Sequence, residues 1–346
     1  MTMATATTGD HVRHDAAIKA LDMVSFSFSV FVIIASNFVT VKQVRFLTDG
    51  GGGNNILDVD HLNRYGGTAM NERYCDIFNL CYPMFAMKSE TFESLMINER
   101  THLIVHCEDE VPVGFAIVEG AALRLICVAP EYQRKGIGSR LLSEAESCAA
   151  EQGQDMLLTG GASSKFLIGA DKTASGFFEK HGYVTVGGCD EMLMKLSDFT
   201  FDESAFRGHQ TAEYSWYHGD IGTLGKAVAE VNEDWVQYFT DGSRVYAATV
   251  GGEIASFCIV DTDVKNYLSD AFGRVGMPGC VGTVPKFRNC GIGIELIARV
   301  TQYLKESGMN ISFIFYTGVA DWYKKLGYEI FMTEVFMKKQ LARGTV

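Results

Sequence analysis

The sequence lacks the marks of a disulfide-stabilised, zinc-binding or nucleic-acid-binding protein. Its nine cysteines are scattered among 346 residues and never spaced as C-x-x-C, which argues against a disulfide framework or a metal site and predicts reduced thiols in a cytoplasmic protein. Positive charge is also scarce, because 30 Lys and Arg face 42 Asp and Glu, and the net charge of −12 argues against a nucleic-acid partner. Apolar residues make up 47% of the chain, with 23 Phe and 14 Tyr, so a packed core is expected rather than disorder.

One segment near the N-terminus carries no charge at all. Met23–Val41 is long enough to span a bilayer, and Lys42 and Arg45 after it would keep the following domains on the cytoplasmic side. Serine, asparagine and threonine interrupt the segment, however, and its Phe-Ser-Phe-Ser alternation has the period of a strand. We therefore expect residues 1–42 to form an N-terminal extension. A membrane anchor at 23–41 is the alternative, and it is the one route to membrane contact that the sequence offers.

A repeat is visible when the second half of the chain is aligned with the first. The segments 128–138 (VAPEYQRKGIG) and 283–293 (TVPKFRNCGIG) align at an offset of 155 residues, 283 − 128. The helix expected after each segment carries one apolar stripe at helical spacing, at Ile137, Leu141, Leu142, Ala145 and Ala149 and again at Ile292, Leu296, Ile297, Val300 and Leu304. Both helices are expected to end before a glycine, Gly153 or Gly308. The repeat therefore extends beyond the loop to the helix that follows it.

Further matches extend the repeat over most of the chain. Three more pairs of segments correspond: 114–118 with 256–260, 177–183 with 322–328, and 191–195 with 334–338. We therefore predict two copies of one unit, at 43–200 and 201–346, joined through 196–209. Each copy begins its central sheet with a predicted hairpin, 102–107 with 113–118 and 244–250 with 253–260. Hairpins followed by a crossover helix predict an α+β fold, in which each domain is a mixed, mostly antiparallel sheet flanked by helices.

The glycine-rich segment of each copy has the features of an anion site. A strand that ends near a proline, followed by Q/R-x-x-G-x-G and a long helix, places free backbone N–H groups at a helix N-terminus, where glycine lets phosphates approach. Basic side chains add positive charge to both loops: Arg134, Lys135 and Arg140 in the first, Lys286 and Arg288 in the second. The pattern is neither the G-x-x-x-x-G-K-[ST] loop of nucleotide hydrolases nor the G-x-G-x-x-G dinucleotide fingerprint. It predicts a ligand that carries a pyrophosphate.

These residues resemble the GNAT superfamily of N-acetyltransferases. The pattern Q/R-x-x-G-x-G at 133–138 and 288–293 is similar to its motif A, and the W-Y-K-K-L-G-Y run at 322–328 is similar to its motif B. The resemblance covers about 43–346, as two GNAT domains in tandem, and implies acetyl-coenzyme A as the cofactor. It implies that two sets of loop residues hold the pyrophosphate, namely Gln133, Arg134, Lys135, Gly136, Ile137 and Gly138, and Arg288, Asn289, Cys290, Gly291, Ile292 and Gly293. The backbone beside Val128 or Val284 would pair with the pantetheine arm and polarise the thioester carbonyl.

The two copies differ at the proton donor that the resemblance implies. In the family a tyrosine of motif B protonates the leaving thiolate, and Tyr323 occupies that place, whereas the first copy has Phe178, which has no proton to donate. The resemblance therefore implies an N-acetyltransferase whose chemistry lies in the second domain. The first domain would bind coenzyme A weakly or for regulation, or serve as a scaffold. Glu119 and Asp261 end equivalent strands, and either could deprotonate the acceptor ammonium directly or through water, with Asp261 as the candidate base of the second domain. The alternative is a coenzyme A-binding regulatory or scaffold protein without turnover.

The acceptor is the least specified part of this hypothesis. We expect a small-molecule or peptide amine, which the net charge of −12 could attract. The resemblance implies that the segments around Tyr74–Tyr82 and Trp216–His218 shape the acceptor pocket. A monomer with an internal pseudo-two-fold axis and a homodimer are both left open.

Overall fold

The computed structural model describes residues 43–48, 55–57, 67–161, 166–206, 212–262 and 267–341. The chain divides into two compact units, the first made of Met1–Cys189 with Thr333–Val346 and the second of Asp190–Met332. The segment Met23–Val41 lies outside the described residues, so both interpretations of it remain predictions. Within the described part of the chain, no helix combines the length and the apolar character that crossing a bilayer requires.

The first unit is built on a mixed sheet in the order β2-β1-β3-β4-β5-β6-β14. Its strands are β1 (Gln43–Thr48), β2 (Asn55–Leu57), β3 (His102–Glu108), β4 (Val111–Glu119), β5 (Ala122–Val128), β6 (Met156–Thr159), β7 (Ala170–Asp171) and β14 (Glu329–Gln340). The predicted hairpin is confirmed, because β3 and β4 pair antiparallel with His102 opposite Val118. β1 runs parallel to β3, and β5 runs parallel to β6, whereas the β4–β5, β6–β14 and β7–β14 pairs are antiparallel.

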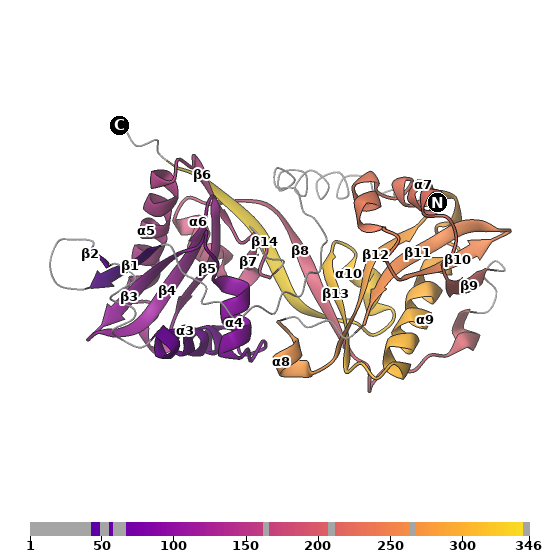
Figure 1. Cartoon of the computed structure of the whole chain (residues 1–346), viewed down its shortest axis with the longest axis horizontal. Coiled ribbons are helices and arrows are strands. Elements are labelled where there is room, and N and C mark those ends of the chain that lie inside the picture. The colour runs from indigo at the N-terminus through magenta and orange to yellow at the C-terminus, as the bar shows by residue number, and fades with distance from the viewer. Residues whose placement is uncertain are drawn as a thin grey trace, which may run out of the picture. The chain divides into compact units, whose positions relative to one another are not determined.

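Helices cover both faces of this sheet (Figure 1). They are α3 (Gly67–Cys81), α4 (Ser89–Met96), α5 (Ile137–Glu151) and α6 (Ser175–Lys180). On one face α5 buries its predicted apolar stripe, and Leu141 shares a core cluster with Ala116 of β4. On the other face Phe115, the preceding residue of β4, meets Tyr74 of α3 and Phe92 of α4, with ring centroids 5.3 and 6.1 Å away. Since successive side chains of a strand point to opposite faces, β4 is buried on both sides.

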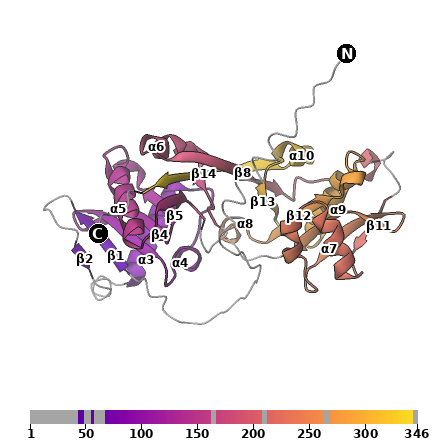
Figure 2. The ribbon, with the colours of Figure 1, turned by 90° about the horizontal axis from the view of Figure 1, so that it is seen from above.

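The second unit repeats this architecture in the strand order β8-β13-β12-β11-β10-β9. Its elements are β8 (Val184–Lys195), β9 (Glu213–Trp216), α7 (Ile221–Ala229), β10 (Val245–Val250), β11 (Glu253–Asp261), α8 (Ser269–Phe272), β12 (Val275–Thr283), α9 (Ile292–Glu306), β13 (Ile311–Thr317) and α10 (Ala320–Lys324). The hairpin of β10 and β11 is confirmed, and it turns through Gly251 and Gly252 with positive φ. α9 lies along β11 and β12 in both views (Figures 1 and 2), while Leu224 of α7 packs with Phe257 on the opposite face. The predicted α+β class, with mixed sheets and flanking helices, is confirmed.

The last strand of each sheet comes from the other half of the repeat. In the first unit β6 pairs with β14, where Lys338 lies opposite Leu158. In the second unit β13, the counterpart of β6, pairs with β8, where Met194 lies opposite Ser312. The matching segments 191–195 and 334–338 are therefore exchanged. The segment from the first copy completes the sheet of the second unit, and the segment from the second copy completes the sheet of the first unit.

This exchange differs from the domain boundaries that the sequence predicted. Contiguous domains at 43–200 and 201–346 were expected, but the first unit ends at Cys189 and takes up Thr333–Val346. Two residues of the expected link at 196–209 are also core residues, since Leu196 and Phe199 are buried in the apolar cluster of the second unit. The physical reason is that two similar strands can fill the same sheet edge, so the repeat alone does not determine which one does.

Candidate active site

In each unit the central parallel pair of strands separates after its first residues. In the described residues, β5 pairs with β6 at Ala122 and Leu123, and β12 pairs with β13 at Val275 and Gly276. The later residues of β5 and β12 are paired on their antiparallel side, with β4 and β11. An opening between the parallel strands therefore lies beside the C-terminal end of β5 and of β12, where each glycine loop begins.

The last residue of β5 turns its backbone toward this opening. Ala129 donates its N–H to the carbonyl of Val113, and hydrogen bonds alternate along an antiparallel pair, so the amide of Val128 points away from β4. The carbonyl of Val128 points the same way, since it accepts hydrogen bonds from Gln133 Nε2 at 2.9 Å and Cys81 Sγ at 3.3 Å. Val128 therefore has the orientation that the expected pantetheine contact requires.

In the second unit the residue equivalent to Val128 is Thr283. The predicted pantetheine contact therefore belongs to Thr283 and not to Val284. Val284 donates its N–H to Ala255 across the antiparallel pair, and its side chain is buried. The backbone of Thr283 faces the opening, and its carbonyl accepts a hydrogen bond from Arg288 Nε at 3.1 Å. The offset of 155 residues already aligns Thr283 with Val128, so the prediction of Val284 was displaced by one residue from the position that the repeat indicates.

The two glycine loops share one backbone conformation. Gly136 and Gly291 have φ values of 87° and 79°, and two residues earlier Arg134 and Asn289 are also left-handed, at 64° and 62°. Each glycine is the N-cap of the helix that follows, and no side chain caps either helix. The first N–H groups of α5 and α9 are therefore available to an external anion. Both isoleucines of the motif contribute only their backbone, because their side chains are buried: Ile137 and Ile292.

The side chains of the two loops differ in charge. In the first unit Arg134 and Lys135 are exposed beside the N-terminus of α5. In the second unit the equivalent positions hold the neutral residues Asn289 and Cys290. The first loop therefore places its positive charge directly before the helix N-terminus, whereas the basic residues of the second loop, Lys286 and Arg288, come earlier in the loop.

A cavity of about 660 Å³ fills the opening in the first unit. It extends from the loop at 133–139 past Val128 to Gly169–Asp171 and Tyr82, and the buried ring of Phe178 from α6 forms part of its wall. It brings together four of the predicted loop residues, Gln133, Arg134, Gly136 and Gly138. The cavity thus joins the loop, the end of β5 and the β7 segment in one continuous space.

Tyr82 lines this cavity. From the sequence, it was expected only as the end of a segment that shapes the acceptor pocket. Its ring stacks on Phe78, with centroids 5.2 Å apart, and lies 6.0 Å from Phe85. Burial raises the pKa of Tyr82 well above its usual value, and four neighbouring groups raise it further: Cys127, Asp171, Cys81 and Glu334. The hydroxyl therefore stays protonated at neutral pH. It also lies within electrostatic range of both the end of β5 and the paired strands β7 and β14.

Tyr323 lies in α10 of the second unit and is 5% exposed. Its ring contacts that of Tyr328, with centroids 5.8 Å apart, and burial raises its pKa. The neighbouring loop is closely packed, because a Cβ atom added to Gly293 would lie 2.5 Å from Thr283 Oγ1 and 3.4 Å from the ring of Trp322. The same addition at Gly138 of the first unit would meet its nearest atom, in Phe177, at 3.5 Å.

The two carboxylates considered as bases have different surroundings. Asp261 is exposed at the end of β11, opposite Met277 of β12. Glu119 is buried at the end of β4, and its carboxylate forms ion pairs with Arg124 at 3.3 Å and Arg100 at 3.2 Å. Glu119 is therefore part of a charge network in the core.

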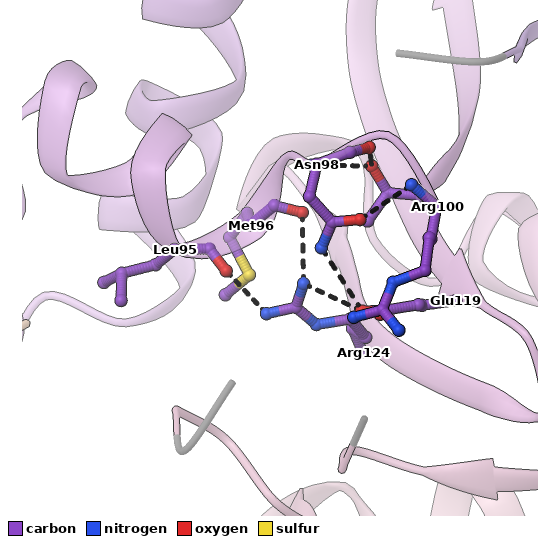
Figure 3. A network of polar contacts seen from close by, with 7 residues as sticks. Leu95, Met96, Asn98, Arg100, Glu119 and Arg124 are labelled. Carbon is purple, nitrogen blue, oxygen red and sulfur yellow. Dashed lines mark hydrogen bonds and ion pairs between the residues drawn. The ribbon is translucent and has the colours of Figure 1, made fainter. Parts of the chain in front are cut away.

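Arg124 connects that network to the end of α4 (Figure 3). Its guanidinium donates to the carbonyls of Leu95 at 2.5 Å and Met96 at 3.4 Å, which belong to the last turn of the helix. A cation at a helix C-terminus satisfies carbonyl groups that have no partner within the helix. Arg124 and Glu119 thus fix α4 against the sheet, which gives Glu119 a structural role in place of the one considered from the sequence.

Comparison with known proteins identifies the architecture. Residues 81–192 match the family model of the acetyltransferase (GNAT) domain. A stretch of 90 residues is 33% identical to the uncharacterized N-acetyltransferase YjcF of Bacillus subtilis, over 25% of this chain and 57% of that protein. A stretch of 171 residues is 25% identical to the tRNA(Met) cytidine acetyltransferase TmcA 2 of Saccharolobus solfataricus, over 48% of this chain and 21% of that protein. The chain therefore spans less than two thirds of either relative.

Solved structures share the fold over more residues than either unit contains. The glucosamine N-acetyltransferase region of a fungal multi-domain GH3 β-N-acetylglucosaminidase has a TM-score of 0.60 at 20% identity, over 78% of this chain and 37% of that one. A GCN5-related N-acetyltransferase from Sphaerobacter thermophilus has a TM-score of 0.57 at 17% identity, over 79% and 93%. A tandem GNAT protein from the clavulanic acid biosynthesis pathway has a TM-score of 0.50 at 14% identity, over 79% and 95%. At these identities the likeness shows the fold alone.

The fold and its glycine loops define a GNAT-type acetyltransferase architecture. Residues 81–192 therefore carry an acetyltransferase domain of the GNAT type, by their match to that family model.

Proposed function

We propose that the chain is an N-acetyltransferase that moves an acetyl group from acetyl-coenzyme A to a primary amine, and that the reaction takes place in the first unit. The observation that carries this proposal is the cavity of about 660 Å³ that joins the glycine loop, the end of β5 and Tyr82. The sequence favoured the second unit because of Tyr323. The cavity is the reason to prefer the first.

The first unit offers a distinct contact for each part of the cofactor. The uncapped N–H groups at 136–139, with Arg134 and Lys135, would hold the pyrophosphate, because a helix N-terminus and nearby cations favour negative charge. The amide of Val128 would donate to the thioester carbonyl and stabilise the oxyanion that develops there. Gln133 keeps this strand end in place through its hydrogen bond to the carbonyl of Val128. Bound acetyl-coenzyme A supplies the acetyl group as a thioester.

Tyr82 donates the proton to the leaving thiolate, because Phe178, at the motif position of the proton donor, has no hydroxyl group. Its hydroxyl is protonated at neutral pH because its pKa is raised. Cys81, its neighbour in the chain, has its sulfur 3.3 Å from the carbonyl of Val128, so Tyr82 lies near the strand end where the leaving thiolate would form. A protonated phenol lining the cavity at this point is suited to donate a proton to that thiolate.

A second acetyl-coenzyme A site in the second unit is supported by its loop, which has the same backbone conformation and the same uncapped helix. There Arg288, Gly291 and Gly293 would hold the pyrophosphate, with Tyr323 as proton donor and Asp261 as base. Binding without turnover, in a regulatory or scaffold protein, is the remaining alternative.

Replacing Tyr82 with Phe tests the proposal, and Tyr323→Phe is the matched control. The aromatic ring is retained in both variants, so its packing should survive. Release of coenzyme A thiol is measured with glucosamine and with spermidine as probe amines. We expect Tyr82→Phe to lower kcat about 100-fold with unchanged affinity for acetyl-coenzyme A, and Tyr323→Phe to keep wild-type turnover.

The opposite result, a loss of turnover in Tyr323→Phe alone, would assign the chemistry to the second unit. Binding of acetyl-coenzyme A to the wild type without release of thiol with either amine would favour a regulatory or scaffold role.

A further inference from the structure

The exchanged strand β14 places a carboxyl group inside the first unit. Glu334 is 0% exposed, and a carboxylate is costly to bury unless its oxygens are hydrogen-bonded. The amides of Ile168 and Gly169 bond to this carboxyl group, and Cys189 Sγ lies 3.9 Å from its Oε2 atom. The other oxygen, Oε1, is buried and has no hydrogen-bond partner among the described residues. One oxygen of the carboxyl group is thus anchored, whereas the other is a buried acceptor whose hydrogen-bonding capacity is unused among the described residues.

Glu334 lies beside the cavity of the first unit. It pairs with Asp171 across β14 and β7, and side chains of directly opposed residues in an antiparallel pair lie on the same face of a sheet. Asp171 lines the cavity together with Tyr82, and the pKa of Tyr82 responds to the charges of both carboxyl groups. The carboxyl group of Glu334 is therefore close to the part of the cavity that Asp171 and Tyr82 line.

The repeat supplies an internal comparison for this residue. Glu191 is the counterpart of Glu334 on β8, and it too is buried, at 2% exposure, within the second unit. There the hydroxyl of Tyr267 donates to Glu191 Oε1 at 3.3 Å. The same oxygen of Glu334 has no such donor among the described residues, and it is the first unit that contains the cavity lined by Tyr82.

The titratable neighbours of Glu334 act in opposite directions. The pKa of Glu334 is raised to about 8: burial and the charge of Asp171 on β7 raise it, while the amides of Gly169 and Ile168 and the thiol of Cys189 on β8 lower it. Tyr82, beyond the end of α3, is neutral at these pH values. A carboxyl group in this state exchanges its proton near physiological pH.

We propose that Glu334 is the group that accepts a proton from the acceptor amine, which therefore enters as an ammonium ion between Tyr82 and Asp171. This inference rests on the proposed N-acetyltransferase function. Glu334 takes one proton from the ammonium ion, and the freed lone pair forms the new C–N bond to the acetyl carbon. As the C–S bond breaks, Tyr82 protonates the thiolate and is reprotonated by the second proton that the nitrogen loses. Glu334 then releases its proton to solvent, so the products are the amide, coenzyme A thiol and one proton.

The test is the pH profile of kcat/KM for wild type and for Glu334→Gln, with Glu191→Gln as the matched control on the other exchanged strand. Glucosamine and spermidine serve as probe amines, and calorimetry with acetyl-coenzyme A is run on each protein. The wild type should gain activity up to about pH 8. Glu334→Gln should lose about 100-fold at pH 7 and should lose this limb of the profile, so that activity follows only the titration of the amine. Its affinity for acetyl-coenzyme A should not change, and Glu191→Gln should match the wild type.

Two results would overturn the inference while leaving the proposed function in place: wild-type turnover in Glu334→Gln, or a uniform loss at every pH with the limb near pH 8 retained. If the wild type binds acetyl-coenzyme A and acetylates neither probe, the proposed function is what fails. The proton acceptor is then tested by infrared difference spectra of wild type against Glu334→Gln. A carboxylic acid band that disappears through about pH 8 supports a proton-exchanging Glu334, and a band that persists to pH 10 or is absent at pH 6 refutes it.

Discussion

The exchanged strands predict that a substitution near the C-terminus weakens the N-terminal unit. Met337 is 0% exposed and packs in the core cluster of the first unit with Leu141 and Phe178. Its repeat counterpart Met194 is 5% exposed and packs in the core of the second unit. Replacing either methionine with Ala removes a buried side chain and should cost about 2 to 5 kcal/mol. That is a large part of the roughly 5 to 15 kcal/mol by which a domain is stable.

The sequence provides a natural reporter for this experiment. All three tryptophans, at 216, 235 and 322, belong to the second unit, so tryptophan fluorescence follows that unit alone, whereas far-UV circular dichroism follows both. In urea, Met337→Ala should lower the midpoint seen by circular dichroism and leave the tryptophan transition in place. Met194→Ala should shift the tryptophan transition. With a slope of about 2 kcal/mol per molar urea, a loss of about 3 kcal/mol corresponds to about 1.5 M.

The reverse pattern would refute the reasoning. If Met337→Ala moves the tryptophan transition and Met194→Ala does not, each half of the chain keeps its own last strand. Equal shifts of a single transition in both variants would show that the units unfold as one and would contradict their separate cores.

Two other predictions concern buried charge. Arg124→Met should destabilise the first unit by about 3 kcal/mol, because it leaves the buried carboxylate of Glu119 without its buried cation. Adding Glu119→Gln should restore much of that loss, and a double-mutant cycle by urea unfolding that proves additive would contradict the network. The pKa of Glu334 is raised from its ordinary range to about 8, so folding takes up a proton between about pH 5 and 8. Wild-type stability should fall across that range by up to about 1.4 kcal/mol per pH unit, Glu334→Gln should remove this slope, and equal slopes in the two proteins would contradict the raised pKa.

Local elements could be predicted from the sequence because their signals lie within a few residues. The Gly251–Gly252 turn marks its hairpin, and the apolar stripe with Gly136 marks α5. The exchange of β8 and β14 left no such signal. The matching segments 191–195 and 334–338 of these strands both begin with Glu and end in Met-Lys, so either one could complete either sheet.

The same limit applies to the candidate site. The glycine motif identified the loop residues, and the structure brings four of them to one cavity. Phe178, at the motif position for a proton donor, argued against the first unit. Tyr82 comes to this cavity from the end of α3, and Glu334 lies beside it on β14, from the far end of the chain. The proximity of Tyr82 and Glu334 to this cavity depends on tertiary packing and not on spacing along the sequence, so the motif did not reveal it.

The central claim is that the first unit holds acetyl-coenzyme A, and its most direct test is calorimetric titration of acetyl-coenzyme A into wild type, Gly136→Trp and Gly291→Trp. A Cβ atom added at Gly136 meets nothing within 4 Å, so the new side chain would occupy the mouth of the loop without displacing packed atoms. The left-handed backbone at this residue adds about 1 to 2 kcal/mol of strain, which unfolding curves would detect separately. We predict that Gly136→Trp abolishes binding in the first unit and that Gly291→Trp leaves that binding intact. Binding that survives Gly136→Trp and disappears with Gly291→Trp would contradict the account.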